Sequence, residues 1–343
     1  MFDLNNLVRE NVKNLVPYSC ARDEFQGQEG IFLDANENPY GNLNRYPDPY
    51  QKELKAELGR IKEIPVENIF LGNGSDEIID LCYRIFCRPG SDTALVFTPT
   101  YGMYEVSAAT NDIGLIKVPL DNNFQIDIGS LGSLLQKPDL KLMFICSPNN
   151  PTGNSMRISD IEYILSEFNG MVVVDEAYSD FSDKPSVKTL SGKYPNLIVM
   201  QTFSKAYGMA AARIGIAFAD RPVIAYLNKM KPPYNISTIN QSAVLQKLRK
   251  MDTFKKQVSQ IKSERKRLTF SLEKMKIIRH VYPSDANFLL VRTDNPELIY
   301  RKLINHKIIV RNRHKVVAGC LRITVGTRKE NDKLLQTLRT IEL

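Results

Sequence analysis

Lysine 205 is the residue in this sequence whose type and setting best suit covalent chemistry. Lys205 follows the apolar run Leu197–Met200 closely and is flanked by Phe203, Ala206 and Tyr207. A lysine that is partly removed from water loses some of its preference for the charged form, so its amine can act as a nucleophile and form a Schiff base with a carbonyl group. A surface lysine beside a loop is the alternative, and an isolated Ser-Lys pair would favour it.

An acidic residue ends a second apolar run. Asp175 comes directly after Met171–Val174, in the segment MVVVDEAYSDF. A carboxylate at the end of a buried strand is costly unless it meets a cation or hydrogen-bond donors. A protonated pyridine nitrogen is one such cation, and an ionised Asp175 would keep the ring protonated so that it withdraws electrons from a substrate carbanion. Taken alone, the position also fits a carboxylate that caps a turn.

A glycine-rich segment, LGNGSDEIIDLCYRIF (71–86), could hold a phosphate. Gly72 and Gly74 permit a tight turn, and a helix that starts near Ser75 would present free N–H groups to an anion. Asp76 would repel that anion, so we expect its side chain to point away. Further groups suited to a phosphate lie around the lysine: Thr202, Ser204 and Arg213.

Two more segments carry hydrogen-bonding and aromatic side chains. Asn150 lies in SPNNPTG (147–153), after the apolar run Leu142–Cys146, although Asn-Pro-Thr-Gly is also a turn signal in itself. Together with Tyr178, Asn150 could donate to a phenolic oxygen of a ligand. Tyr101, in TPTYGMY (98–104), follows the run Thr93–Phe97 and could stack on a planar ring.

These segments need a parallel sheet to bring them together. From about residue 34 to residue 232, short apolar runs alternate with helical patterns, which predicts an α/β fold with a largely parallel sheet covered on both faces. In such sheets ligands bind beyond the carboxyl ends of the strands, and the polar motifs fall at those ends. We therefore predict a large ligand-binding domain over residues 34–232.

The two ends of the chain read differently. Residues 1–33 predict an N-terminal arm with one short helix over Leu4–Leu15. After Pro232-Pro233, a charged helical region leads into a smaller C-terminal α/β domain, residues 233–343. In that tail the sequence predicts strands at Asn287–Arg292, Ile308–Val310 and Leu321–Val325, a helix near Pro296–His306 and a last helix.

Composition excludes several other classes of protein. The apolar fraction of 43% and charged fraction of 24% are ordinary for a globular protein, and no apolar run is long enough to cross a bilayer. No secretory signal is visible, so we expect a cytoplasmic location. Five scattered cysteines and three separate histidines predict free thiols and no metal site.

The net charge of +8 raises the question of nucleic acid. The basic residues are dense at 247–267, at helical spacing and almost without aromatic residues. That pattern favours a solvated helix face over a nucleic-acid surface. A positive field would instead suit small anionic substrates.

The motifs GSD, PTY, NPTG, DEAY, SK and a later arginine occur in an order that resembles the fold-type-I pyridoxal-phosphate-dependent aminotransferases. Within them the chain most closely resembles the histidinol-phosphate aminotransferases. The similarity runs from LDANENPYG (33–41) and NRYP (44–47) to GCLRITVGT (319–327). The resemblance implies pyridoxal 5'-phosphate as the cofactor and a mostly parallel seven-stranded sheet in the large domain.

The resemblance also implies a role for each matching residue. Lys205 would carry the cofactor as a Schiff base and then move the substrate proton, and Asp175 would pair with the pyridinium nitrogen. Asn150 and the catalytic Tyr178 would contact the phenolic oxygen, while Tyr101 would stack on the ring. The remaining cofactor-binding residues would be Gly74, Ser75, Asp76, Thr202, Ser204 and Arg213.

Substrate recognition and assembly follow from the same resemblance. Arg322 would hold either a phosphate or a carboxylate, because a guanidinium fork fits both anions. Arg311 and Tyr18 are similar to accessory substrate contacts, and Asn36 would lie nearby. In the family a tyrosine at the position of Tyr46 reaches the cofactor phosphate of the partner subunit, which implies a homodimer with shared active sites. The loop before Tyr46 is shorter than in many relatives, a departure that could shift this contact.

The expected reaction is transamination between L-histidinol phosphate and 2-oxoglutarate, giving imidazole-acetol phosphate and L-glutamate in L-histidine biosynthesis. An aromatic or general amino-acid aminotransferase would use the same catalytic groups. A threonine-phosphate decarboxylase would use the same lysine and arginine but release carbon dioxide. A ligand-sensing protein built on the same scaffold is a further alternative. For Arg311, a surface charge among Arg313, His314 and Lys315 is equally compatible with the sequence.

Overall fold

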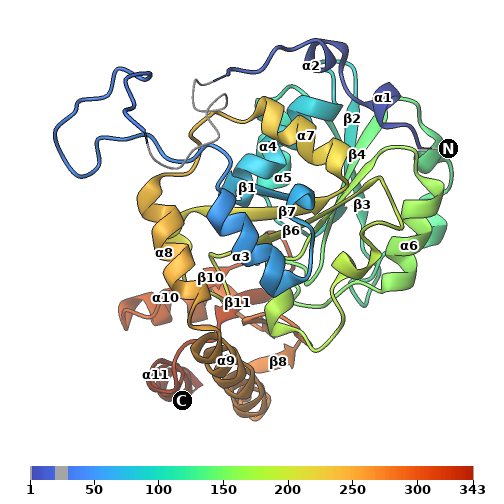
Figure 1. Ribbon diagram of the computed structural model, residues 1–343. Coiled ribbons are helices and arrows are strands. Elements are labelled where there is room, and N and C mark those ends of the chain that lie inside the picture. The colour runs from blue at the N-terminus through green and yellow to red at the C-terminus, as the bar shows by residue number, and fades with distance from the viewer. Residues whose placement is uncertain (1, 20–29, 343) are drawn as a thin grey trace.

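The larger of two sheets contains seven strands. The computed structural model describes residues 2–19 and 30–342, and within these ranges the sheet consists of β1 (Ile69–Asn73), β2 (Thr93–Thr98), β3 (Gly114–Pro119), β4 (Leu140–Cys146), β5 (Met171–Asp175), β6 (Leu197–Thr202) and β7 (Ile214–Ala219). The strand order is β1-β7-β6-β5-β4-β2-β3 (Figure 1). Neighbouring strands from β6 to β3 run parallel, whereas β7 is antiparallel to both of its neighbours. The predicted mostly parallel seven-stranded sheet is confirmed.

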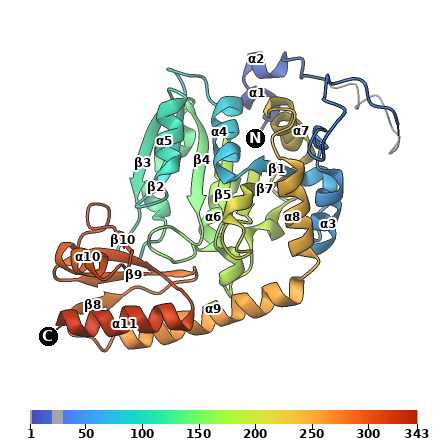
Figure 2. The ribbon, with the colours of Figure 1, turned by 90° about the vertical axis from the view of Figure 1, so that its left-hand side faces the viewer.

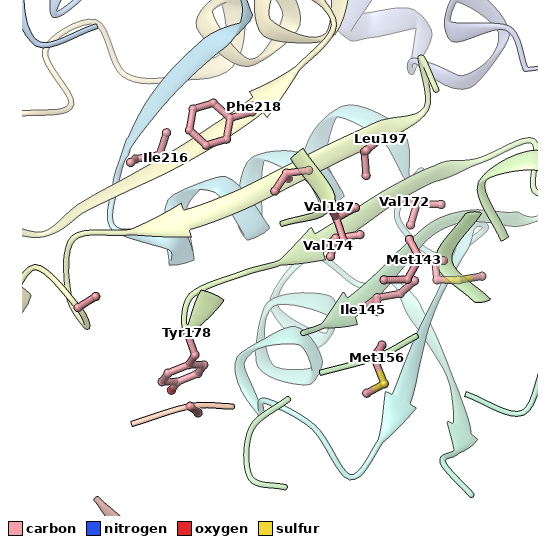
Figure 3. Packing of buried hydrophobic residues seen from close by; sticks show 14 of the residues in the cluster. Met143, Ile145, Met156, Val172, Val174, Tyr178, Val187, Leu197, Ile216 and Phe218 are labelled. Carbon is pink, nitrogen blue, oxygen red and sulfur yellow. The ribbon is translucent and has the colours of Figure 1, made fainter. Parts of the chain in front are cut away.

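Helices cover both faces of this sheet. Alternate residues of β5 point to opposite sides: Val172 and Val174 pack in one hydrophobic cluster, Met171 and Val173 in the other. Figure 3 shows the first cluster, with Val172 and Val174 close to Met143. Its covering helices are α3 (Lys52–Lys62), α6 (Ile158–Glu167) and α8 (Thr238–Leu248); the opposite face is covered by α4 (Ser75–Phe86), α5 (Met103–Thr110) and α7 (Arg221–Met230). Burial on both faces explains the continuous apolar runs in the sequence.

A second, four-stranded sheet forms near the C-terminus. It is antiparallel throughout, in the order β10-β11-β9-β8. Its strands are β8 (Ile278–Val281), β9 (Phe288–Thr293), β10 (Arg311–Asn312) and β11 (Cys320–Thr324), and its helices are α9 (Met251–Leu272), α10 (Pro296–Asn305) and α11 (Arg328–Glu342). Figure 2 shows α9 and α11 side by side beneath this sheet. The sheet and helices share one apolar core.

The strand predicted at Ile308–Val310 is wrong. Ile308 and Val310 pack against the core of the smaller sheet without pairing to a strand, and β10 begins one residue later, at Arg311. The pairing with β11 sets this position, because Arg311 lies opposite Arg322 and Asn312 opposite Leu321. Apolar character alone did not reveal which residues reach β11.

The single helix predicted over Leu4–Leu15 is also wrong. The structure has two short helices, α1 (Leu4–Leu7) and α2 (Glu10–Lys13), with Val8 extended between them. The backbone N–H of Arg9 donates to the carbonyl of Ile85 at 3.0 Å, and its guanidinium donates to the carbonyl of Arg84 at 2.8 Å. Docking against the end of α4 interrupts the helix.

The segment from residue 30 to α3 contains no helix or strand and extends away from the body (Figure 1). Large apolar side chains are exposed on it: Ile31 is 91%, Leu33 88% and Tyr40 83% exposed. Large apolar side chains gathered on one segment in this way are unusual on the surface of a globular protein. The boundaries of the three predicted parts of the chain stay predictions.

Other sequence predictions have mixed outcomes. The basic run 247–267, predicted to form one solvated helix face, is divided between the end of α8 and α9. Most of its basic side chains are exposed, whereas Arg265 is buried and donates to the carbonyl of Ala286 at 2.6 Å. Four cysteines are buried free thiols: Cys82, Cys87, Cys146 and Cys320. Cys20 lies outside the described residues. Within the described ranges, no helix combines the length and apolar character that crossing a bilayer requires, and no three metal-binding side chains form a group. The cellular location stays a prediction.

Candidate active site

One cavity of about 360 Å³ lies where the strands of the large sheet end and the smaller sheet begins. Most of the residues singled out in the sequence line it: Ser75, Asp76, Tyr101, Asn150, Asp175, Tyr178, Thr202, Ser204, Lys205, Arg213, Arg311 and Arg322. Cys146, Ala177, Ala210 and Arg313 complete the lining. Gly74 immediately precedes Ser75 at the start of α4.

The sheet register explains this convergence. In the parallel pairing, Cys146 of β4 lies beside Asp175 of β5, and Asp175 lies beside Met200 of β6. The loops that leave β4, β5 and β6 therefore start at one edge of the sheet, and they carry Asn150, Tyr178 and Lys205. This is the edge at which open α/β sheets bind ligands.

Asp175 is buried at the inner end of the cavity. Its Oδ2 accepts a hydrogen bond from Tyr104 Oη at 2.7 Å, and its Oδ1 accepts one from the Ala177 N–H at 3.0 Å. Burial raises the pKa of Asp175, while these two hydrogen bonds and the charge of Lys205 oppose that rise. A cation placed against the carboxylate would favour its ionised form further.

Tyr104 is a site residue that sequence reasoning missed. Its ring is fully buried and stacks on Phe144, with ring centroids 4.8 Å apart. Burial and the neighbouring carboxylate of Asp175 raise the pKa of Tyr104, so its hydroxyl stays protonated and donates. The segment TPTYGMY contains it, but only its place on α5 shows that Tyr104 turns inward.

Lys205 faces the cavity from the loop after β6. Its Nζ lies 5.7 Å from the centroid of the Tyr178 ring. Desolvation by the surrounding protein lowers the pKa of Lys205, and the nearby charge of Arg322 lowers it further. Because a lowered pKa increases the neutral fraction of an amine, Lys205 is better suited to nucleophilic chemistry than a solvated lysine.

A cradle for an anion lies at the start of α4. Gly74 has φ +79° and lacks a side chain, and a Cβ there would lie 2.5 Å from Arg213 Nη2. Gly215 is packed as tightly, since a Cβ there would lie 2.5 Å from the backbone nitrogen of Ser75. These glycines let the Arg213 guanidinium and the first N–H groups of a twelve-residue helix share one corner.

The Asp76 side chain lines the cavity in that corner, contrary to the prediction that it points away. Its Oδ2 lies 3.3 Å from Arg213 Nη2, and its Oδ1 accepts a hydrogen bond from Tyr101 Oη at 3.3 Å. The acid therefore orients the Arg213 and Tyr101 side chains. Thr202 Oγ1 accepts a hydrogen bond from the Ser204 N–H at 3.1 Å, which holds the start of the loop that carries Lys205.

The opposite wall combines both sheets. Arg322 of β11 donates from Nη1 to Asn150 Oδ1, and its guanidinium carbon lies 5.2 Å from the centroid of the Phe288 ring. Because the amide oxygen of Asn150 accepts from Arg322, its amide nitrogen is left to donate to a ligand. Tyr178 packs edge-on against Phe288, with centroids 5.1 Å apart, and burial raises the pKa of its hydroxyl.

Besides Gly74, which only adjoins the lining, three predicted residues lie away from the cavity of this chain. Tyr46 is 48% exposed and stacks on Tyr234, with centroids 4.4 Å apart. Asn36 lies with Tyr46 around a separate surface hollow. Tyr18 is 71% exposed, beside Pro49 and other residues of a different hollow. Their predicted roles stay predictions.

The residues of the cavity fit pyridoxal 5'-phosphate, which the sequence resemblance implied. A single space contains a primary amine, a buried carboxylate and an anion cradle formed by backbone N–H groups and Arg213. The side chain that a residue other than glycine would place at position 74 would fill that cradle. A ring nitrogen, an aldehyde and a phosphate are the partners that these three groups select.

Comparisons with known proteins agree with this chemistry. Residues 26–338 match the family described as aminotransferase class I and II. The chain is 49% identical over 346 residues to a histidinol-phosphate aminotransferase of Cytophaga hutchinsonii, with 99% of each chain covered. In structure it is similar to the histidinol-phosphate aminotransferase from Clostridium acetobutylicum, at 26% identity and a TM-score of 0.80, covering 88% of this chain and 91% of that one. The enzyme from Sinorhizobium meliloti, solved in complex with pyridoxal-5'-phosphate, has the same fold, at 23% identity and a TM-score of 0.79 over 90% of each chain.

Proposed function

The chain belongs to the class I and II aminotransferases, and from that premise we propose that it transfers the amino group of L-histidinol phosphate to 2-oxoglutarate. The products are imidazole-acetol phosphate and L-glutamate, in L-histidine biosynthesis. Pyridoxal 5'-phosphate is the cofactor. The observation that carries the proposal is one cavity that joins Lys205 and Asp175 to a cluster of arginines.

The residues would hold the cofactor by its separate groups. Asp175 would take the ring nitrogen, and the Asn150 amide and Tyr178 hydroxyl would take the phenolic oxygen. Arg213 and the N–H groups at the start of α4 would take the phosphate. When bound, the cofactor supplies an electron sink that stabilises negative charge at the substrate carbon.

Lys205 would perform the proton transfer. In its neutral form, Nζ accepts the proton that leaves the substrate carbon next to the nitrogen, and it returns that proton later in the reaction. The lowered pKa of Lys205 supports this role, because the free amine must exist near neutral pH. Tyr104 would act through Asp175 by keeping its carboxylate oriented.

Arg322 would bind both substrates through their anionic groups. L-histidinol phosphate presents a phosphate and 2-oxoglutarate presents carboxylates, and a guanidinium fork accepts either. The contact with Asn150 holds Arg322 near the place where the amine reacts. A site that takes the two substrates in turn implies ping-pong kinetics.

We also infer a homodimer in which Tyr46 of each subunit completes the site of the other. The exposed apolar side chains on the arm support it, because Ile31, Leu33 and Tyr40 are each more than four-fifths exposed. Tyr46 lies on the same segment and outside the cavity of its own chain. A partner subunit would cover the arm and receive Tyr46.

The test is a half-reaction with the loaded enzyme. L-histidinol phosphate alone should convert the cofactor to its amine form, with a matching loss of visible absorption and one equivalent of imidazole-acetol phosphate. Added 2-oxoglutarate should restore the absorption. Phenylalanine and threonine phosphate serve as controls. Absence of any change with histidinol phosphate, a faster change with phenylalanine, or release of carbon dioxide from threonine phosphate would contradict the proposal.

A further inference from the structure

Three arginines face the cavity from the smaller sheet: Arg311, Arg313 and Arg322. Arg311 and Arg322 lie directly opposite each other in the β10–β11 pairing. Arg313 follows β10 at the start of the turn, where its backbone N–H donates to the carbonyl of Cys320 at 3.0 Å. The family resemblance supplied roles for Arg311 and Arg322 but none for Arg313.

Among the described residues, no acid forms an ion pair with this arginine cluster. Within residues 2–19 and 30–342, no ion pair joins Arg311, Arg313 or Arg322 to an aspartate or glutamate. Of the two acids that line the cavity, Asp76 pairs with Arg213, and Asp175 accepts from Tyr104 and Ala177. Within the described part of the chain, the positive charge of the cluster is therefore uncompensated.

The guanidinium of Arg313 has a hydrogen-bond donor without a partner among the described residues. Its Nε is buried and makes no hydrogen bond within the described part of the chain, and the same is true of Arg322 Nε. Burial, together with the charges of Arg322 and Arg311, lowers the pKa of Arg313. Neighbouring guanidinium groups repel one another, so an anion between them would relieve this repulsion and supply acceptors.

The number of arginines points to the kind of anion. A carboxylate carries one negative charge and two oxygens, which one guanidinium fork satisfies. A phosphate monoester carries a charge of about −1.5 to −2 near neutral pH and three acceptor oxygens. A third arginine should therefore strengthen the binding of a phosphate considerably. It should strengthen the binding of a carboxylate only slightly, because Arg322 alone can hold that group.

We propose that Arg313 is a specificity-determining residue that makes this site favour a phosphate over a carboxylate. The inference rests on the proposed function, because it assigns Arg313 to the phosphate of the amino substrate and leaves Arg322 to the anions of both substrates. Arg313 thereby makes the site bind phosphorylated amines more tightly than aromatic amino acids.

The experiment compares anion binding to the cofactor-loaded enzyme and to its Arg313→Gln variant. Inorganic phosphate and acetate are the probes, titrated by calorimetry while the cofactor phosphate site is filled. Loss of hydrogen bonds to a charged group should raise the Kd of phosphate roughly 10- to 100-fold. The Kd of acetate should change less than about threefold, since Arg322 remains. Glutamate should likewise keep its KM, while that of histidinol phosphate rises with that of other phosphorylated amines.

Lys315→Gln is the matched control, since Lys315 is an exposed cation on the same turn and lies outside the cavity lining. It should leave both affinities unchanged. Arg313→Lys keeps the charge without the fork and should bind phosphate with intermediate affinity. If Arg313→Gln has a lowered melting temperature, the phosphate affinity of Arg313→Lys tests the inference instead. Unchanged phosphate binding, or equal weakening of phosphate and acetate, would overturn the inference.

The inference and the proposed function can fail separately. A loaded enzyme that does not convert histidinol phosphate would refute the proposed function. If that enzyme still preferred phosphate to acetate and lost the preference in Arg313→Gln, the role of Arg313 would stand. The preferred amine would then be a different phosphorylated compound.

Discussion

Tyr104 donates a hydrogen bond of 2.7 Å to Asp175, and both side chains are buried. The tyrosine comes from α5 on one face of the sheet, and the acid comes from the end of β5. The bond fixes one carboxylate oxygen, while the Ala177 N–H fixes the other. Asp175 is therefore oriented before any ligand arrives, which is the preorganisation that an electrostatic role needs.

The Tyr104→Phe variant should bind pyridoxal 5'-phosphate less tightly. Loss of this donor raises the pKa of Asp175 further, so less of the carboxylate is ionised as the pH falls. The loss of a hydrogen bond to a charged group predicts a roughly 10- to 100-fold rise in the Kd of the cofactor, larger at pH 6 than at pH 8. Absorbance titration of the cofactor-free protein at both pH values measures this.

Tyr83→Phe is the matched control for that variant. Tyr83 is also buried, but its hydroxyl donates to the backbone carbonyl of Tyr104 at 2.8 Å and not to Asp175. It should lose stability without a pH-dependent loss of cofactor. Equal cofactor affinity for Tyr104→Phe and the unchanged protein at both pH values would show that the hydroxyl does not support Asp175.

The Arg322→Gln variant should raise the pKa of Lys205. A positive charge nearby favours the neutral amine, so its removal favours the charged form, and the fraction of free amine at a given pH falls. An amine-reactive label on cofactor-free protein, located by peptide mass spectrometry, should react with Lys205 at higher pH than before. Arg279→Gln, on an exposed pair with Asp294, should leave the profile in place. If the pH profile of Lys205 labelling is unchanged in Arg322→Gln, or moves to lower pH, the charge of Arg322 does not lower the pKa of Lys205.

The Glu176→Ala variant should be less stable, although Glu176 has no part in the proposed reaction. The buried Glu176 carboxylate accepts from Ser186 Oγ at 2.5 Å, the Val187 N–H at 2.6 Å and Gln201 Nε2 at 2.9 Å. The Val187 and Gln201 donors are buried and the Ser186 donor is half-buried, so their loss of an acceptor predicts a loss of stability of about 3 kcal/mol. Thermal melting should show a lower transition than for Glu167→Ala, whose carboxylate is exposed. A melting temperature equal to that of Glu167→Ala would mean that the network contributes nothing to stability.

Mixed dimers should recover activity that neither parent has. If Tyr46 completes the partner's site, a Tyr46→Ala subunit and a Lys205→Ala subunit together form one intact site in each mixed dimer. Random reassortment of equal amounts predicts about a quarter of the unchanged activity, because half of the dimers are mixed. Activity after joint refolding, compared with each variant refolded alone, provides the measurement. No recovery despite exchange of subunits would place both residues within one chain's site.

The strand ends of the large sheet could be predicted from sequence, because a parallel sheet buried on both faces leaves a plain signal. Met171–Val174 and Leu197–Met200 are continuous apolar runs, and each is followed at once by polar residues. Strand geometry then places Asp175 and Lys205 at one edge whatever the details of the loops. Because both residues lie at that edge, they can act on the same ligand.

Residues whose direction depends on tertiary packing could not be predicted. Tyr104 lies in a helix, and only the docking of α5 on the sheet turns its hydroxyl toward Asp175. Arg313 follows a two-residue strand in a segment dense in charge, which reads as exposed surface. The break at Val8 depends on contacts of Arg9 with the end of α4, far away in sequence.

The central claim is that Lys205 binds the cofactor covalently while facing Asp175. Borohydride reduction of the purified, loaded protein, followed by proteolysis and mass spectrometry, tests it most directly. We predict one modified tryptic peptide, YPNLIVMQTFSKAYGMAAAR (194–213), with the pyridoxyl phosphate group on Lys205 and on no other lysine. A loaded protein in which the label lies on another lysine, or in which none is fixed by reduction, would contradict the account.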